Sequence, residues 1–168
     1  MLKKLVRGWF APVSASYQNF QKALLLGDIR AMNLYMNRVA ASVFSFFDTG
    51  NRPSESEPER FYHGFVLGLI VELEDRYVIT SNRESGFGRY DVMLEPKRDG
   101  DPAIIMECKV QDPGAERALE DTVKAALHQM EEKKYAEGLK ARGISDDRIR
   151  QYGFAFCGKR VLIGERKK

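Results

Sequence analysis

Three charged residues lie inside apolar segments of this 168-residue chain, where a buried charge needs a partner. Asp91 interrupts the run Arg-Tyr-Asp-Val-Met-Leu, and Glu107 and Lys109 end the run Ala-Ile-Ile-Met-Glu-Cys-Lys-Val. If both runs are strands, their side chains alternate between two faces, so Glu107 and Lys109 point the same way. If the strands are neighbours, Asp91 comes level with Glu107. We therefore expect two carboxylates to converge beside one lysine.

Two converging carboxylates suit Mg²⁺ or Mn²⁺, which prefer oxygen ligands and keep several waters. Such a metal polarises a phosphoryl oxygen and lowers the pKa of a bound water. A lysine can orient or deprotonate that water, or stabilise charge in the transition state. This is the outline of a phosphodiester hydrolysis site. The alternative is a structural ion pair between Glu107 and Lys109 on an exposed strand face, with Asp91 in a turn, because this spacing often arises by chance.

The surrounding segments predict strands and helices that would hold these residues in one layer. Runs of apolar and β-branched residues predict strands at Tyr77–Thr80, Arg89–Glu95, Ala103–Val110, Tyr152–Cys157 and Arg160–Ile163. The glycine- and serine-containing segment 81–88 predicts a turn, and Gly158-Lys159 predicts a hairpin turn.

Helical periodicity predicts the remaining elements. A mostly buried helix begins near Pro58, a long helix covers about Ala115 to Leu139, and a short helix covers about 145–150. A further helical region runs from about Ser16 to Phe47, broken at Gly27, with Asp28 as the N-cap of its second piece. We expect 1–57 to form a helical N-terminal extension packed on a core of residues 58–168. The order of that core is α-β-β-β-α-β, an α/β arrangement.

Composition excludes several classes of protein. Hydrophobic residues make up 43% and charged residues 30%, and no apolar run is long enough to cross a membrane. Cys108 and Cys157 do not make a disulfide framework or a zinc site, and we expect a cytoplasmic, reducing location. The net charge of +3 neither demonstrates nor opposes binding to nucleic acid.

The spacing from Asp91 to Glu107-Cys108-Lys109 resembles the D-x(n)-E-x-K motif of the PD-(D/E)XK nuclease superfamily. Longer strings, among them ERFYHGFVLGL, ESGFGRYDVMLEP and YGFAFCGKRVLIG, resemble a bacterial group within it. In that group the nuclease-like domain follows an AAA-ATPase-like region, so the resemblance implies such a region in cis or in trans. It also implies a restriction-endonuclease-like core, a mixed sheet flanked by helices. Tyr90 departs from the motif, which names a proline there.

The resemblance implies roles for five residues. Asp91 and Glu107 would bind the metal, and Lys109 would be the catalytic lysine. Many superfamily members also use a glutamate on the first core helix, where Glu59 lies; its alternative role is a favourable charge at a helix N-terminus. Relatives often place a glutamine or tyrosine on the helix after the ExK strand, where Gln129 fits and Tyr135 is a weaker candidate. The alternative for Gln129 is a solvent-facing helix position.

The segment before Asp91 holds candidates for substrate binding. Glycines allow a close approach of the backbone, so Arg83, Ser85 and Arg89 could contact phosphates. The alternative is an ordinary hairpin with surface arginines.

Together these observations predict a Mg²⁺- or Mn²⁺-dependent endo- or exodeoxyribonuclease acting on DNA, with RNA left open. Two alternatives remain. One is a non-catalytic module of nuclease ancestry that binds nucleic acid or regulates an ATPase partner. The other is an interaction domain whose phenylalanine-rich N-terminal helices pack on another chain.

Overall fold

The computed structural model describes residues 14–43, 57–85 and 88–166, which form a five-stranded sheet with helices on both faces. The strands are β1 (Tyr77–Ser85), β2 (Gly88–Pro96), β3 (Ala103–Val110), β4 (Ile149–Cys157) and β5 (Arg160–Glu165). They lie in the order β1-β2-β3-β4-β5. The pair β3–β4 is parallel and the other three pairs are antiparallel. The expected α/β fold with a mixed sheet is therefore confirmed.

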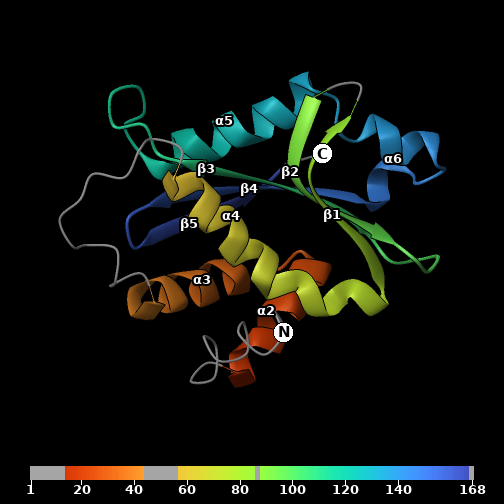
Figure 1. The fold of residues 1–168 in the computed structure, drawn as a ribbon, viewed down its shortest axis with the longest axis horizontal. Coiled ribbons are helices and arrows are strands. Elements are labelled where there is room, and N and C mark those ends of the chain that lie inside the picture. Colours follow the sequence, from red (N-terminus) through yellow and green to blue (C-terminus); the bar gives the residue numbers. More distant parts are fainter. Residues whose placement is uncertain (1–13, 44–56, 86–87, 167–168) are drawn as a thin grey trace.

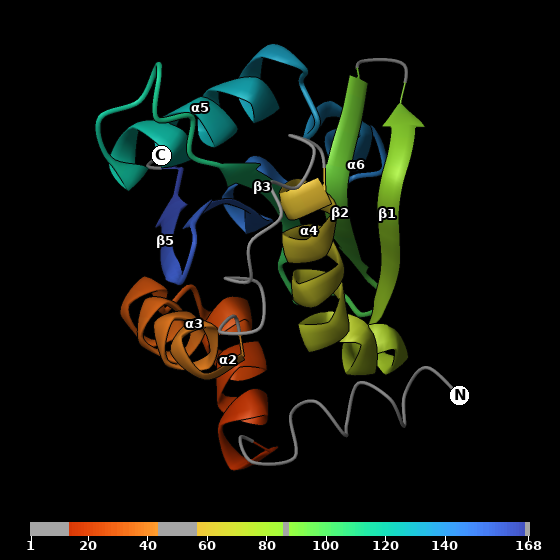
Figure 2. The ribbon, with the colours of Figure 1, turned by 60° about the vertical axis from the view of Figure 1, so that its left-hand side comes forward.

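Helices α5 (Leu119–Glu132) and α6 (Glu137–Ala141) cover one face of the sheet. Helices α2 (Ser14–Leu26), α3 (Ile29–Val43) and α4 (Glu57–Ile70) lie on the other side (Figures 1 and 2). A short 3-10 helix, Val71–Asp75, leads from α4 into β1. The β3–α5–β4 segment is thus the crossover that the parallel pairing requires.

The hairpin before Asp91 is longer than the sequence predicted. We expected a turn over 81–88, but β1 continues to Ser85 and β2 begins at Gly88. The antiparallel pairs Arg83–Tyr90, Glu84–Arg89 and Ser85–Gly88 extend the ladder. Cross-strand hydrogen bonding therefore overrides the turn propensity of the serine, asparagine and glycine residues.

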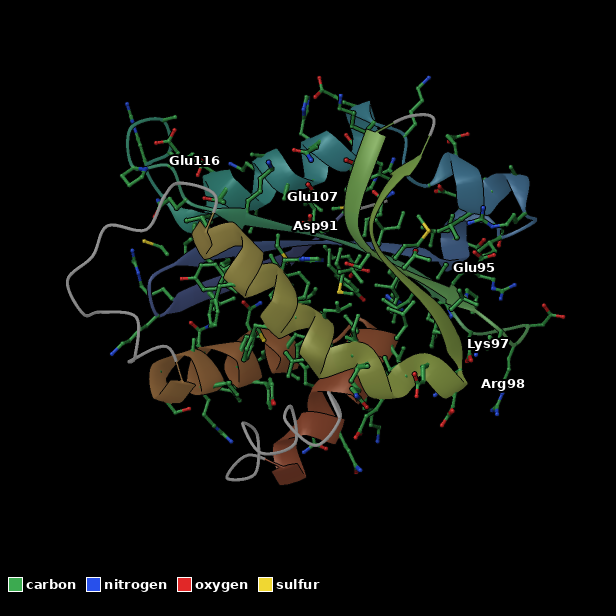
Figure 3. The ribbon with its side chains drawn as sticks, in the orientation of Figure 1. Asp91, Glu95, Lys97, Arg98, Glu107 and Glu116 are labelled. Atoms are coloured by element: carbon green, nitrogen blue, oxygen red, sulfur yellow. The ribbon has the colours of Figure 1, made fainter. Side chains whose placement is uncertain are left out.

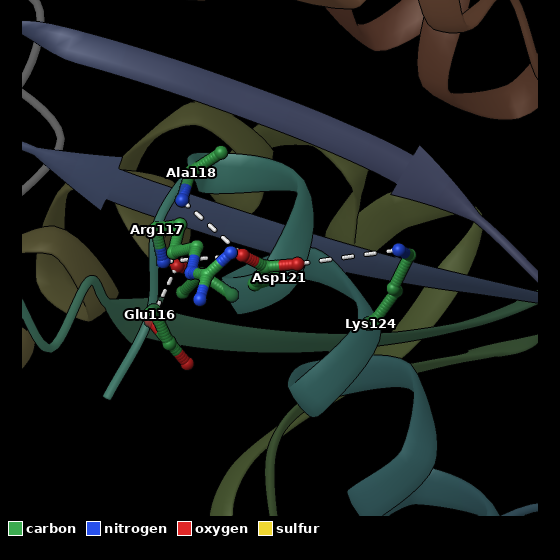
Figure 4. Close-up of polar contacts among 6 residues, drawn as sticks. Glu116, Arg117, Ala118, Asp121 and Lys124 are labelled. Carbon is green, nitrogen blue, oxygen red and sulfur yellow. Dashed lines mark hydrogen bonds and ion pairs between the residues drawn. The ribbon is translucent and has the colours of Figure 1, made fainter.

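The helix expected over Ala115–Leu139 is broken, which corrects that prediction. Helix α5 begins at Leu119, where the Asp121 carboxylate accepts hydrogen bonds from the backbone N–H groups of Arg117 (3.1 Å) and Ala118 (3.2 Å), as Figure 4 shows. It ends at Glu132, and Lys134 takes a positive φ of 51°. This left-handed residue redirects the chain, so Tyr135, Ala136 and Leu139 are buried against the sheet.

The end of the crossover also differs from expectation. In place of a short helix over 145–150, a 3-10 turn covers Asp146–Arg148 and β4 begins at Ile149. Pairing of Ala103 with Ile149 and of Ile104 with Arg150 draws these residues into the sheet. The predicted hairpin at Gly158 is confirmed, with a positive φ of 56° there and Cys157 paired to Arg160.

The N-terminal helices pack on the sheet and cover its β5 edge. Asp28 caps α3 as predicted, since its Oδ1 accepts a hydrogen bond from Ala31 N at 2.9 Å. Asn33 and Asn37, one turn apart on α3, bond β5 through their side-chain amides. Each accepts a hydrogen bond from a β5 N–H and donates one to the carbonyl of the same residue, Ile163 for Asn33 and Val161 for Asn37. These amides satisfy an edge that would otherwise be open to another strand.

A single apolar cluster joins α2, α3 and α4 to the sheet. A smaller cluster lies under α5 and α6. The division of the chain at residue 57 stays a prediction.

Candidate active site

The candidate site lies where the pairing of β2 with β3 stops. The last pair of this ladder is Val92–Met106, and the next residues on the two strands are Asp91 and Glu107. Asp91 Oδ2 accepts a hydrogen bond from the backbone N–H of Cys108 at 2.7 Å. The carboxylate therefore reaches across to β3 and is held beside Glu107 (Figure 3).

Both acids point toward α5. Ile105 and Met93 belong to the apolar cluster under α5 and α6, whereas Met106 and Cys108 belong to the cluster on the other face. Because side chains alternate along a strand, Glu107 shares its face with Ile105, and Asp91 shares its face with Met93. Glu107 is only 4% exposed.

Gln129 on α5 contacts Glu107 directly, donating a hydrogen bond from Nε2 to Glu107 Oε1. Gly153 makes this approach possible, because it pairs with Glu107 across the parallel ladder and lies directly under α5. A Cβ at Gly153 would lie 3.0 Å from the carbonyl oxygen of Val123 and 3.1 Å from Ala126 Cβ. A glycine is thus needed for α5 to pack at this depth.

Tyr135 completes the buried polar group around Glu107. It is 3% exposed, and its hydroxyl lies 3.5 Å from Gln129 Nε2. Burial is the main cause that raises the pKa of Tyr135, and the negative charges of Glu107 and Asp91 raise it further, against a lowering by the Gln129 hydrogen bond. The phenol therefore stays protonated at neutral pH.

From the sequence, Tyr135 is a weaker candidate than Gln129, which lies six positions before it. On a continuous helix that spacing would place the two side chains on different faces. The break at Lys134 brings them together. The charged run Glu131–Lys134 was the available signal, since it lacks an apolar residue that could continue the buried stripe.

His63 on α4 supports the backbone at Asp91. Its Nε2 lies 3.1 Å from the carbonyl oxygen of Asp91 and 2.9 Å from Ser81 Oγ. In the β1–β2 ladder, Ser81 pairs with Val92 and Arg83 pairs with Tyr90. Asp91 lies between Tyr90 and Val92, so His63 contacts the ladder between these two pairs. The sequence has no local pattern that predicts this tertiary contact.

Lys109 is half-buried and lies two residues beyond Glu107, on the same face of β3. It lines an open groove of about 580 Å³, whose other walls come from α5 and include Gln129. The lysine thus lies between the two acids and solvent.

The oxygen donors fit a hard divalent cation. Asp91 and Glu107 are both anionic oxygen ligands, and Mg²⁺ is often bound by one or two carboxylates with waters and substrate phosphates. Within residues 14–43, 57–85 and 88–166, no group of three or more His, Cys, Asp or Glu side chains is arranged to hold a metal. A closed, four-ligand zinc site does not fit this set, whereas an open Mg²⁺ or Mn²⁺ site does.

Four other predicted site residues have side chains outside the described part of the structure. The backbone of Glu59 lies in the first turn of α4, Arg83 and Ser85 lie near the end of β1, and Arg89 lies near the start of β2. Their roles stay predictions. The same holds for the catalytic roles of Asp91, Glu107, Lys109 and Gln129, although the structure places these four together.

Comparison with known proteins identifies the family of the chain. The family model of the PD-(D/E)XK nuclease superfamily matches residues 57–166. No curated protein and no solved structure matches the chain. None of the helices in the described segments is long and apolar enough to span a membrane.

Proposed function

Because the chain belongs to the PD-(D/E)XK nuclease superfamily, we propose that it is a metal-dependent nuclease that hydrolyses phosphodiester bonds in DNA. One observation carries the proposal: Asp91 is bonded to the backbone of Cys108 and so lies next to the buried Glu107. A half-buried acid beside a buried one is repelled by it, and a bound cation offsets that repulsion. The restriction-endonuclease-like fold of the superfamily agrees with the mixed sheet.

Asp91 and Glu107 would hold Mg²⁺ or Mn²⁺. When bound, the metal would supply Lewis-acid polarisation of the phosphoryl oxygen and a bound water of lowered pKa. The Cys108 N–H orients Asp91, and Gln129 orients Glu107, so neither carboxylate has to be immobilised when the metal arrives.

Lys109 is suited to the chemistry that follows. Its ammonium group projects from the face that carries Glu107, toward the groove where a phosphate would enter. From there it can orient the attacking water or stabilise negative charge that builds up on the phosphate. Gln129 and Tyr135 exclude bulk water from the inner side of Glu107.

The test is cleavage of single-stranded, duplex and branched DNA in Mg²⁺ or Mn²⁺, comparing wild type with Asp91→Ala and Lys109→Ala. Each change should lower the cleavage rate by about 100-fold or more, because it removes a group that stabilises the transition state. Glu95→Gln is the matched control. Glu95 lies on the same face of β2, but its carboxylate pairs with Arg142 at 2.8 Å. The same cleavage assay on RNA of the same sequence tests whether the protein also cuts RNA.

Equal cleavage by wild type and both variants would contradict the proposal. If no substrate is cut while DNA and metal still bind, the better description is the non-catalytic module that regulates an ATPase partner.

A further inference from the structure

The groove beside the acids is lined mainly by charged side chains of one helix face. We call it the α5 groove and define it by Lys109, Lys124, His128, Gln129, Glu132 and Lys133. Four of them, Lys124, His128, Gln129 and Glu132, lie on α5, and Lys133 is its C-cap. These five residues share a face because they recur at spacings of one, four and five residues. The opposite face of α5 carries the buried residues Val123, Ala126 and Met130.

The α5 groove is positively charged. Lys109, Lys124 and Lys133 contribute three ammonium groups, against the one carboxylate of Glu132. His128 Nδ1 lies 3.3 Å from that carboxylate. Lys124 is 79% exposed and contacts Asp121 only loosely, at 4.0 Å (Figure 4). Exposed pairs of this kind bind weakly, so the ammonium is available to another anion.

The groove is continuous with the candidate active site. Gln129 lines it and donates a hydrogen bond to Glu107. Lys109 lines it as well, two residues from Glu107 on the same strand face. An anionic chain lying along α5 would therefore lead directly to the two acids.

From this continuity we infer that the α5 groove binds the sugar-phosphate backbone of the nucleic-acid strand that is cut. The inference rests on the proposed nuclease function and adds the path of the substrate. The residues that define the groove are all polar or charged, and Ala125 also lines it. Such a surface suits phosphates better than base stacking, which uses aromatic platforms. Contacts to phosphates carry no sequence information, so binding here is sequence-independent and sensitive to salt.

The experiment measures binding apart from cleavage. A fluorescent single strand and the corresponding duplex are titrated in EDTA at several salt concentrations, with wild type, Lys124→Ala, Lys133→Ala and the double variant. Each phosphate contact contributes about 0.9 to the salt slope on duplex and about 0.7 on a single strand. At about 0.15 M salt, one lost contact therefore weakens duplex binding by about five-fold.

The double variant should lose about 30-fold in affinity at the same salt. In Mg²⁺ or Mn²⁺ its KM should rise, while kcat at saturation stays close to that of wild type. Lys22→Ala is the matched control, since Lys22 is an exposed lysine on α2, beyond the opposite face of the sheet. It should bind and cleave as wild type does.

Three outcomes can be distinguished. Loss of affinity and of salt slope in the α5 variants, with Lys22→Ala unchanged, supports the inference. If wild type binds and cleaves and the double variant does the same with equal affinity and slope, the path is elsewhere and the nuclease proposal stands. If wild type neither binds nor cleaves any strand, both proposals fail. Thermal unfolding of each variant checks that these exposed positions leave the fold intact.

Discussion

The two faces of the sheet bury very different side chains. On the face under α2, α3 and α4, residues from all five strands and from these three helices form one large apolar cluster. On the face under α5 and α6 the apolar cluster is smaller, and the acids lie beside it. Strand β3 contributes to both, with Met106 and Cys108 on one side and Glu107 and Lys109 on the other. Residues that stabilise the fold therefore alternate along β3 with residues proposed to act in catalysis. Substitutions at neighbouring positions should separate effects on stability from effects on activity.

Glu107→Gln should have the largest effect, and it should act on activity. The amide keeps the size of the side chain but removes a metal-binding charge, so cleavage should fall by about 1,000-fold, or about 4 kcal/mol in activation free energy. The free energy of unfolding should stay the same or rise, because burial of a carboxylate opposes folding. Single-turnover cleavage and urea unfolding measure the two quantities. A large loss of stability would mean that Glu107 is structural.

Met106→Ala, at the adjacent position, should lower stability and leave metal binding unchanged. Met106 is fully buried in the large cluster, and truncation leaves a cavity, so the free energy of unfolding should fall by about 3 kcal/mol. Below the temperature at which the variant unfolds, Mg²⁺ affinity should match that of wild type. If Met106→Ala weakened metal binding as much as Glu107→Gln, the two faces would not be separable.

Gly153→Ala should affect both quantities, because Gly153 sets the distance between α5 and Glu107. Its new Cβ would meet the Val123 carbonyl oxygen at 3.0 Å, so α5 must shift. We expect a loss of about 2 kcal/mol in unfolding free energy from overpacking, with a fall in cleavage rate. Gly64→Ala is the control, because its Cβ would meet nothing within 4 Å. In a helix it should stabilise slightly. A wild-type cleavage rate in Gly153→Ala would show that the distance between α5 and Glu107 does not affect activity.

Asn37→Ala tests the β5 edge of the sheet, where α3 packs on the face that we expect to stabilise the fold. The change leaves the N–H and carbonyl of Val161 without their side-chain partner, at a cost of about 1–2 kcal/mol. Hydrogen exchange should accelerate at the Val161 amide, and cleavage should be unchanged. Asn37→Asp serves as a second variant that keeps the acceptor but loses the donor. Exchange at Val161 as slow as in wild type would argue against the bonding described.

Tyr77→Phe should have the smallest effect at neutral pH. The Tyr77 hydroxyl is buried and has no hydrogen-bond partner among the described residues, so its removal should change stability by less than about 1 kcal/mol. Burial raises the pKa of Tyr77 to about 12, from 10.0. The folded state therefore holds the proton more tightly than the unfolded state, and this contribution is lost as pH rises from 10.0 to about 12. Urea unfolding across that range should show a shallower decline in the variant, and an equal decline would contradict this.

Local patterns predicted the strands and the shared face of Glu107 and Lys109, because side-chain alternation needs no tertiary information. They also predicted the Asp28 cap and the Gly158 turn. The same patterns failed at Lys134, where a left-handed residue interrupts a run with good helix propensity. Contacts of His63 with the Asp91 backbone, and of Asn33 and Asn37 with β5, join segments far apart in sequence. Only the fold determines such contacts.

The central claim is that Asp91 and Glu107 bind a divalent cation, and metal-dependent stability tests it most directly. A ligand that binds only the folded state at about 100 times its Kd stabilises it by about 2.7 kcal/mol. For a chain of this size that raises the Tm by about 5–11 °C. We predict such a rise for wild type in Mn²⁺, and none for Glu107→Gln or Asp91→Asn. An equal rise in all three proteins would contradict the account, because the cation would then bind elsewhere.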